Sequence, residues 1–142
     1  MTIKELSKYH DLKIEVDDLH NRIKELETTI VKASRFSDMK VDRSFSNTSP
    51  TEQLVIKLEK LKSKYNTKSL LLLDEMERIE TYLDMINDNE VRTIMRKRFI
   101  DLMTWEEVAS QMHYSNPVPY YKVRKFLNGW LYIQFHIWRV KR

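Results

Sequence analysis

Glycine, proline and cysteine are scarce in this chain. Its 142 residues include one Gly, three Pro and no Cys. Sandwiches and barrels need many tight turns, so a chain this poor in turn-forming residues favours a few long helices. A single glycine excludes the glycine-rich loops that cradle nucleotide phosphates. The missing cysteine excludes disulfides, thiolate zinc sites and a cysteine nucleophile. We therefore expect an all-α protein.

Long apolar runs are missing as well. No stretch approaches the roughly 18 apolar residues of a membrane-spanning helix. The N-terminus is charged throughout and lacks the apolar core of a signal peptide. The absence of cysteine agrees with a reducing compartment. We expect a cytoplasmic protein with no membrane association.

Acidic residues are missing from the C-terminal end of the chain. Residues 92–142 carry 10 Lys and Arg against 3 Asp and Glu, whereas the whole chain has a net charge of +4. No acidic residue follows Glu107. A basic half joined to a mildly acidic half is typical of a polyanion-binding module on a separate scaffold. A solvated basic tail would give the same composition.

Two stripes of apolar residues, spaced by three and four positions, predict two long helices. One helix is expected from about Ile3 to Ala33 and the other from Pro50 to about Ile86, with a loop over about residues 34–50. The first stripe is Tyr9, Leu12, Val16, Leu19, Ile23, Leu26, Ile30 and Ala33. The second is Leu54, Leu58, Leu61, Tyr65, Leu72, Met76, Ile79, Leu83 and Ile86, with Lys68 in one apolar position.

Such narrow stripes must pack on another helix, on a second copy of the chain, or on both. Residues 1–87 are therefore predicted to form an antiparallel helical hairpin, or coiled coil, that also oligomerises. Ser49 and Glu52 form a capping box at the start of the second helix, with Pro50 at its first position. Asn66 and Thr67 could instead divide this helix into two.

Shorter helices are expected in residues 88–128. Asn87 as N-cap and Glu90 three residues later predict a helix from Val91 to about Leu102. Thr104 and Glu107 form another capping box, which opens a helix over residues 105–112. A turn at residues 113–115 and a helix rich in Lys, Arg and Tyr follow. The small residue Ala109 suits the close crossing of a helix-turn-helix, so we predict that motif here.

The second helix of this motif would be the recognition helix. One face, formed by Tyr120, Val123, Phe126 and Leu127, is expected to pack on the core. The predicted DNA-contacting residues, from the outward face and from the basic helix before the motif, are Asn116, Val118, Tyr121, Lys122, Arg124, Lys125, Arg96 and Arg98. Lysines can meet phosphates or guanine edges, and tyrosine can meet a phosphate or a thymine methyl. A plain helical hairpin with a basic surface is the alternative.

The tail, residues 129–142, is aromatic and basic. Gly129 is predicted to end the recognition helix. Helix is favoured over strand for the tail, because the rest of the chain offers no partner strand. Its aromatic side chains are expected to pack on the long helices or on a second subunit.

No enzyme site can be assembled from these residues. The four histidines lack helical partners for a metal, and Asp17, Asp18 and His20 diverge around a helix. No nucleophile, base and orienting group come together. Glu77, Glu80, Asp84 and Asp88 predict a solvated acidic face, or a docking surface for a basic partner. We expect neither catalysis, nor a metal, nor a cofactor.

One segment resembles the region-four helix-turn-helix of bacterial sigma factors and, more closely, the small phage-encoded transcriptional regulators of the RinA and ArpU type. The matching residues are Arg92, Arg98, Phe99, Ile100, Thr104, Trp105, Glu106, Glu107, Val108 and Ala109, followed by Tyr114 and Ser115. Ser46-Asn47-Thr48-Ser49, Thr51 and Glu52 are also similar to that group, so the resemblance covers about residues 46–127. It implies a phage or prophage regulator that activates late genes in the bacterial cytoplasm, acting with host RNA polymerase.

These observations together predict a homodimer or higher oligomer that binds double-stranded DNA sequence-specifically. Two-fold symmetry would suit two half-sites. One alternative is a phage small terminase subunit, which binds DNA for packaging. Another is a protein-binding adaptor whose helix-turn-helix has lost its DNA contacts, because Pro117 and Pro119 replace the usual basic helix start.

Overall fold

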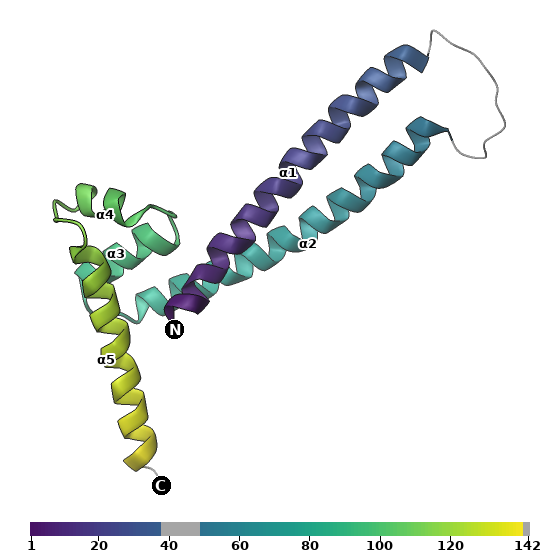
Figure 1. The fold of residues 1–142 in the computed structure, drawn as a ribbon. Coiled ribbons are helices and arrows are strands. Elements are labelled where there is room, and N and C mark those ends of the chain that lie inside the picture. Colours follow the sequence, from purple (N-terminus) through teal and green to yellow (C-terminus); the bar gives the residue numbers. More distant parts are fainter. Residues whose placement is uncertain (38–48, 141–142) are drawn as a thin grey trace. The chain divides into compact units, whose positions relative to one another are not determined.

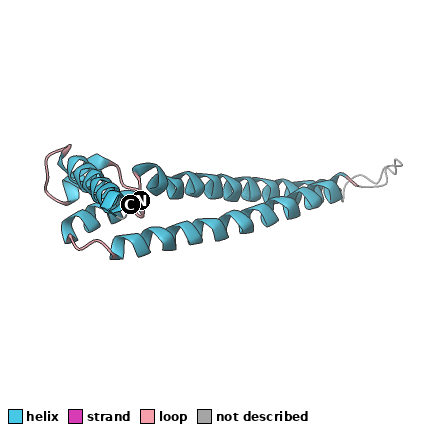
Figure 2. Ribbon diagram, turned by 90° about the horizontal axis from the view of Figure 1, so that it is seen from below, coloured by secondary structure: helices cyan, strands magenta, loops and turns pink. Residues whose placement is uncertain are grey.

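The structure is a computed structural model that describes residues 1–37 and 49–140, with only the backbone described for Ser37 and residues 130–140. The helices are α1 (Ile3–Ser37), α2 (Pro50–Asp84), α3 (Asn89–Phe99), α4 (Trp105–Gln111) and α5 (Val118–Val140) (Figure 1). The described residues contain no strand (Figure 2), which confirms the predicted all-α class. None of the described helices is both long and apolar enough to cross a membrane.

The chain divides into two compact units. One comprises Leu12–Leu72, and the other comprises Met1–Asp11 together with Leu73–Arg142. The end of α2 and the first turns of α1, which the sequence places in the long-helix segment 1–87, thus group with the C-terminal helices.

The unit formed by Leu12–Leu72 is an antiparallel hairpin of α1 and α2, which lie side by side in both ribbon views (Figures 1 and 2). Glu15 lies 2.6 Å from Lys68, and Glu27 lies 2.9 Å from Lys62. Residue numbers rise along α1 as those of the partners fall along α2, so the two helices run in opposite directions.

The hairpin is held by the apolar stripes that the sequence predicts. Val16, Leu19, Ile23 and Leu58 are buried, and the other members of the stripes in this unit are half-buried. Lys68 occupies an apolar position of the stripe and pairs with Glu15. The Lys68 ammonium donates to the Glu15 carboxylate, and this bond lowers the pKa of Glu15 below its ordinary value.

The second long helix is continuous through Asn66 and Thr67, so it is not divided there. The Thr67 hydroxyl donates to the carbonyl of Ser63 at 3.1 Å, which satisfies this polar side chain within the helix. The capping box at its start is confirmed: the Glu52 N–H donates to Ser49 Oγ at 3.2 Å, and the Ser49 N–H donates to Glu52 Oε2 at 2.8 Å. Residues 46–48 of the resemblance lie outside the described residues.

The other unit packs the first turns of α1 and the end of α2 with α3, α4 and α5. Its buried apolar side chains are Leu6, Tyr9, Ile79, Tyr82, Leu83, Ile86, Val91, Ile94, Met95, Phe99, Val108, Ala109, Val123 and Leu127. The three C-terminal helices contact one another pairwise. Of the face of the second motif helix that was predicted to pack on the core, Val123 and Leu127 are buried, whereas Tyr120 and Phe126 are only half-buried.

Four predicted helix boundaries are wrong. Helix α1 continues to Ser37, four residues beyond the predicted end at Ala33. The N-cap of α3 is Asp88, not Asn87, because Asp88 Oδ1 accepts the N–H groups of Glu90 at 2.9 Å and Val91 at 3.1 Å. This helix ends at Phe99 rather than Leu102, which adopts the left-handed region with φ 58°. Gly129 does not end the last helix, which continues to Val140 as an unbroken helix without a positive φ at the glycine. The side-chain packing of the aromatic tail lies outside the described residues.

Candidate nucleic-acid interface

A short helix, a turn and a long helix follow one another in residues 104–140. Helix α4 opens with the predicted capping box, in which Glu107 N–H donates to Thr104 Oγ1 at 3.2 Å and Thr104 N–H donates to Glu107 Oε2 at 2.7 Å. These bonds from Thr104 lower the pKa of the Glu107 carboxyl. The following turn has His113 in the left-handed region, with φ 56°. Tyr114 N–H donates back to the Ala109 carbonyl at 2.8 Å, so the turn folds onto α4.

A small residue lies where the two helices of the motif pack. Ala109 is only 2% exposed, and α4 contacts α5. The buried side chains of the partner helix include Pro119, Val123 and Leu127. Both prolines were expected in the first turn of the helix, but only Pro119 lies there; Pro117 precedes α5, and its carbonyl accepts the Tyr121 N–H at 3.3 Å. This packing is the helix-turn-helix arrangement expected from the sequence.

Aromatic rings connect the three helices of the unit. The Trp105 ring lies edge-on to Phe99 at 6.3 Å and to Tyr120 at 5.5 Å between centroids. Tyr120 in turn lies 5.6 Å from Tyr121, whose side chain is 59% exposed. The contacts of Trp105 with Phe99 and Tyr120 hold α5 against α3 and α4, whereas the Tyr121 ring at the other end of the series lies at the surface.

An exposed face follows the first half of α5. Four of the eight predicted DNA-contacting residues are exposed on it or at its tip: Asn116, Tyr121, Arg124 and Lys125. Asn128, which was not among the predicted residues, is also exposed and lies one turn beyond Arg124. The helical period could have found it. Among the described residues, Arg124 and Lys125 form no salt bridge, so their charges are available to a partner.

Val118 and Lys122 are less accessible than predicted for an outward face, since both are half-buried. Lys122 Nζ lies 2.6 Å from Glu90 Oε2 on α3 and 3.4 Å from the Tyr114 hydroxyl. Its ammonium also lies 4.8 Å from the centroid of the Tyr114 ring. This cation is therefore engaged within its own unit.

The two predicted arginines of α3 are also engaged within the unit. Arg96 lies 3.0 Å from Glu80 and 3.8 Å from Asp84, so two carboxylates predicted to form a solvated acidic face have a partner in the chain. Arg98 donates to the Met103 carbonyl at 2.6 Å and lies over the Trp105 ring. The composition gives the number of Lys and Arg residues but does not show which of them already interact with other residues of the chain.

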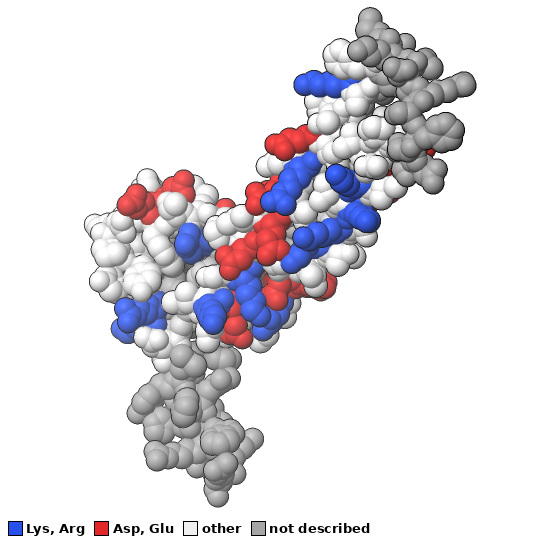
Figure 3. Space-filling view, turned by 45° about the vertical axis from the view of Figure 1, so that its right-hand side comes forward, with Lys and Arg blue, Asp and Glu red and all other residues white. Residues whose placement is uncertain are grey.

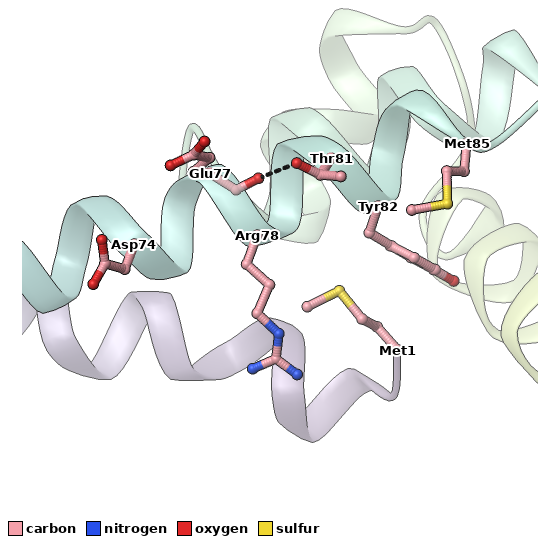
Figure 4. A pocket seen from close by; sticks show the side chains of 7 residues that line it. All are labelled: Met1, Asp74, Glu77, Arg78, Thr81, Tyr82 and Met85. Carbon is pink, nitrogen blue, oxygen red and sulfur yellow. Dashed lines mark hydrogen bonds between the residues drawn. The ribbon is translucent and has the colours of Figure 1, made fainter.

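Other kinds of site find little support in the described residues. No group of three or more His, Cys, Asp or Glu among them could hold a metal ion. A hollow of about 480 Å³ is lined by Met1, Asp74, Glu77, Arg78, Thr81, Tyr82 and Met85 (Figure 4). Burial raises the pKa of Tyr82 there, and Thr81 donates to the Glu77 carbonyl. These groups supply neither a nucleophile with a base nor an oxyanion site.

Fold and site together define an all-α protein in which a helical hairpin precedes a helix-turn-helix unit with an exposed cationic face. The chain belongs to the family described as "protein of unknown function (DUF722)", whose model matches residues 15–129. The match includes the hairpin unit from Glu15 onward, α3, α4 and the first half of α5. Neither the search of curated proteins nor the search of solved structures found a match.

Proposed function

We propose that the protein binds double-stranded DNA sequence-specifically as a transcriptional regulator, with α5 as its recognition helix. The observation that carries this proposal is the exposed face of α5, which presents Tyr121, Arg124 and Lys125 directly after the turn of a helix-turn-helix. The major groove of DNA, about 12 Å wide, admits one α-helix. The N-terminal part of such a helix reaches base edges.

The chemistry of this face suits a duplex. Arg124 can donate two parallel hydrogen bonds to a guanine edge, and Lys125 can pair with a phosphate. Tyr121 and Asn128 add a hydroxyl and an amide at the same surface. No acidic residue follows Glu107 in the sequence, so no carboxylate of the recognition helix would repel the DNA backbone.

A second copy of the chain is proposed to pack on the hairpin. Large apolar side chains remain exposed on its α2 helix, with Ile56 at 50% and Leu70 at 64%. They lie seven residues on either side of the small Ser63, so all three share one face of a helix with a heptad repeat. In the view of Figure 3, Lys, Arg, Asp and Glu intermingle over the hairpin, which favours packing on protein over binding a polyanion.

Leu70→Glu should therefore shift the oligomer toward the monomer in sedimentation equilibrium while helical content is retained. Lys64→Glu on the same helix is the control, because Lys64 is exposed and lies about 100° around the helix from Ser63, away from the apolar face. An equal effect of both substitutions would contradict this interface. Large rings in the wild-type chain would favour the small terminase alternative over a dimeric regulator.

The biological setting rests on the resemblance alone. The regulator would activate phage late genes in the bacterial cytoplasm by contacting host RNA polymerase near the promoter. The adaptor alternative keeps one supporting observation, namely that Pro117 and Pro119 stand where a basic helix start is usual. Binding to DNA separates the two.

The test begins with selection of bound fragments from genomic DNA by the full-length chain. Fluorescence anisotropy on a selected duplex then compares wild type with the double variant Arg124→Gln, Lys125→Gln. We expect a loss of affinity of at least about tenfold, since one good base or phosphate contact contributes about 1–3 kcal/mol. Lys57→Gln with Lys60→Gln, two exposed lysines of α2, is the control and should bind like wild type. Absence of wild-type binding at about 50 mM salt would refute the proposal.

A further inference from the structure

One ammonium group links three segments of the C-terminal unit. Lys122 lies in the second turn of α5, Glu90 in the first turn of α3, and Tyr114 in the turn between α4 and α5. The Lys122 ammonium donates to Glu90 at 2.6 Å and to the Tyr114 hydroxyl at 3.4 Å. It also lies 4.8 Å from the centre of the Tyr114 ring.

We infer that Lys122 is a positioning residue, which sets the angle of the recognition helix by tying α5 to Glu90 and Tyr114, and that it does not itself contact DNA. The inference rests on the proposed function, because it assigns a role at the same DNA-binding face. The two lysines of that face then have different roles. Lys122 is a strut, meaning that it holds α5 in position, and Lys125 contacts DNA.

Two of the three hydrogen-bond donors of the Lys122 ammonium are already used within the unit. An ammonium has three donors, and Glu90 and Tyr114 accept from two of them. The two charged side chains are about equally screened, with 36% of Lys122 and 37% of Glu90 exposed. Glu90 also lies at the N-terminus of α3, where the helix dipole favours a carboxylate. A phosphate could reach only the third donor of Lys122, and it would meet the Glu90 carboxylate that lies 2.6 Å from the ammonium.

The packing of α5 on the start of α3 leaves a hollow open at the surface. A cavity of about 430 Å³ lies beside the ion pair, lined by Asp88, Val91, Lys125, Phe126 and Gly129. A Cβ built on Gly129 would meet no described atom within 4 Å. Because the contact between the start of α3 and α5 leaves this hollow open, we expect the polar tether to restrain the angle of α5 in addition to the buried side chains of Val123 and Leu127. Its loss should let α5 tilt without unfolding the core.

The salt dependence of DNA binding tests this role. Each phosphate contact adds about 0.9 to the slope of log affinity against log salt. Lys125→Gln should lower the magnitude of the slope by about one. Lys122→Gln should weaken binding but leave the slope at its wild-type value. A slope lowered by about one in Lys122→Gln would overturn the inference, because it would identify Lys122 as a phosphate contact.

A charge exchange supplies the rescue. Glu90→Lys and Lys122→Glu should each weaken DNA binding at least about threefold, because each places like charges together. The double variant Glu90→Lys, Lys122→Glu should recover most of that loss. Circular dichroism checks that all variants keep their helices. Binding by the double variant no better than that of Lys122→Glu would refute the strut.

The wild-type chain separates failure of this inference from failure of the proposed function. If wild type binds no duplex, the proposed function fails, and the positioning role fails with it. If wild type binds and Arg124→Gln, Lys125→Gln does not, the recognition face stands, and the Lys122 slope together with the charge exchange decides the strut alone.

Discussion

The guanidinium of Arg98 lies over the indole ring of Trp105, with its central carbon 5.3 Å from the ring centroid. The same side chain donates to the Met103 carbonyl at 2.6 Å. Arg98, near the end of α3, thus contacts both Met103 in the loop and Trp105 at the start of α4, and holds the loop between the two helices in place. The face of α4 that supports the recognition helix is fixed by these contacts.

Arg98→Ala should lower the free energy of unfolding by about 1–2 kcal/mol, because it removes a charged hydrogen bond and a cation–π contact. Urea denaturation followed by circular dichroism measures the change. Arg124→Ala is the matched control, since Arg124 is exposed and forms no salt bridge among the described residues. The control should stay within about 0.5 kcal/mol of wild type. Equal losses in both variants would contradict the structural role of Arg98.

Ala109→Leu should destabilise the C-terminal unit by about 1–3 kcal/mol, because extra methylene groups cannot fit beside a residue that is 2% exposed. Ser110→Leu adds comparable bulk at the next position of α4, which is exposed. Differential scanning calorimetry should therefore show a clearly lower Tm for the first variant and a Tm near wild type for the second. A tolerated Ala109→Leu would mean that α4 and α5 do not cross closely.

The capping box of Thr104 and Glu107 predicts a pH dependence. The Thr104 N–H and hydroxyl lower the pKa of the Glu107 carboxyl from its ordinary 4.5. A lowered pKa means that this stabilisation is complete above 4.5 and is lost as the pH falls through the folded-state value. Glu107→Ala, which removes the carboxylate itself, should lower Tm at neutral pH, and the difference from wild type should shrink as the pH falls below the folded-state pKa of Glu107. A difference independent of pH would show that the carboxylate plays no part.

His113→Gly should leave stability unchanged or raise it by up to about 1 kcal/mol. The left-handed backbone at His113, with φ 56°, costs an L-residue about 1–2 kcal/mol, and glycine gives back part of this through its freedom in the unfolded chain. Ser115→Gly is the control, because Ser115 has no positive φ and should only lose stability. Urea denaturation of both variants gives the comparison. A larger loss in His113→Gly than in Ser115→Gly would contradict the argument.

The parts of the fold that depend on local sequence were predictable. The apolar stripes through Leu19 and Leu58 and the capping boxes at Ser49 and Thr104 involve residues within a few positions of each other. The N-cap of α3 could not be predicted in this way, because Asn and Asp are equally good N-cap residues and the choice between Asn87 and Asp88 depends on how α2 ends. Gly129 was misread for a related reason: glycine ends a helix only where the backbone turns left-handed, and neighbouring turns of α5 continue past it.

The candidate site was only partly predictable. Helical periodicity places Tyr121, Arg124 and Lys125 on one side of α5, and these residues are exposed in the structure. It does not reveal that Lys122 meets Glu90, which is 32 positions away, or that Arg96 meets Glu80, which is 16 positions away. Such pairs depend on how the helices pack. The packing decides whether a given cation is free to bind a partner or instead forms an ion pair that stabilises the fold.

The pairing of Lys68 with Glu15 also determines which alignment of the hairpin helices is allowed. If α1 slid by one heptad in either direction, its apolar stripe would still fit, but Lys8 or Arg22 would replace Glu15 beside Lys68. Either slip would bring two positive charges together next to an apolar seam. A lysine that weakens the apolar seam thereby disfavours the two nearest misalignments of the helices, and either slip would also break the pair of Glu27 with Lys62.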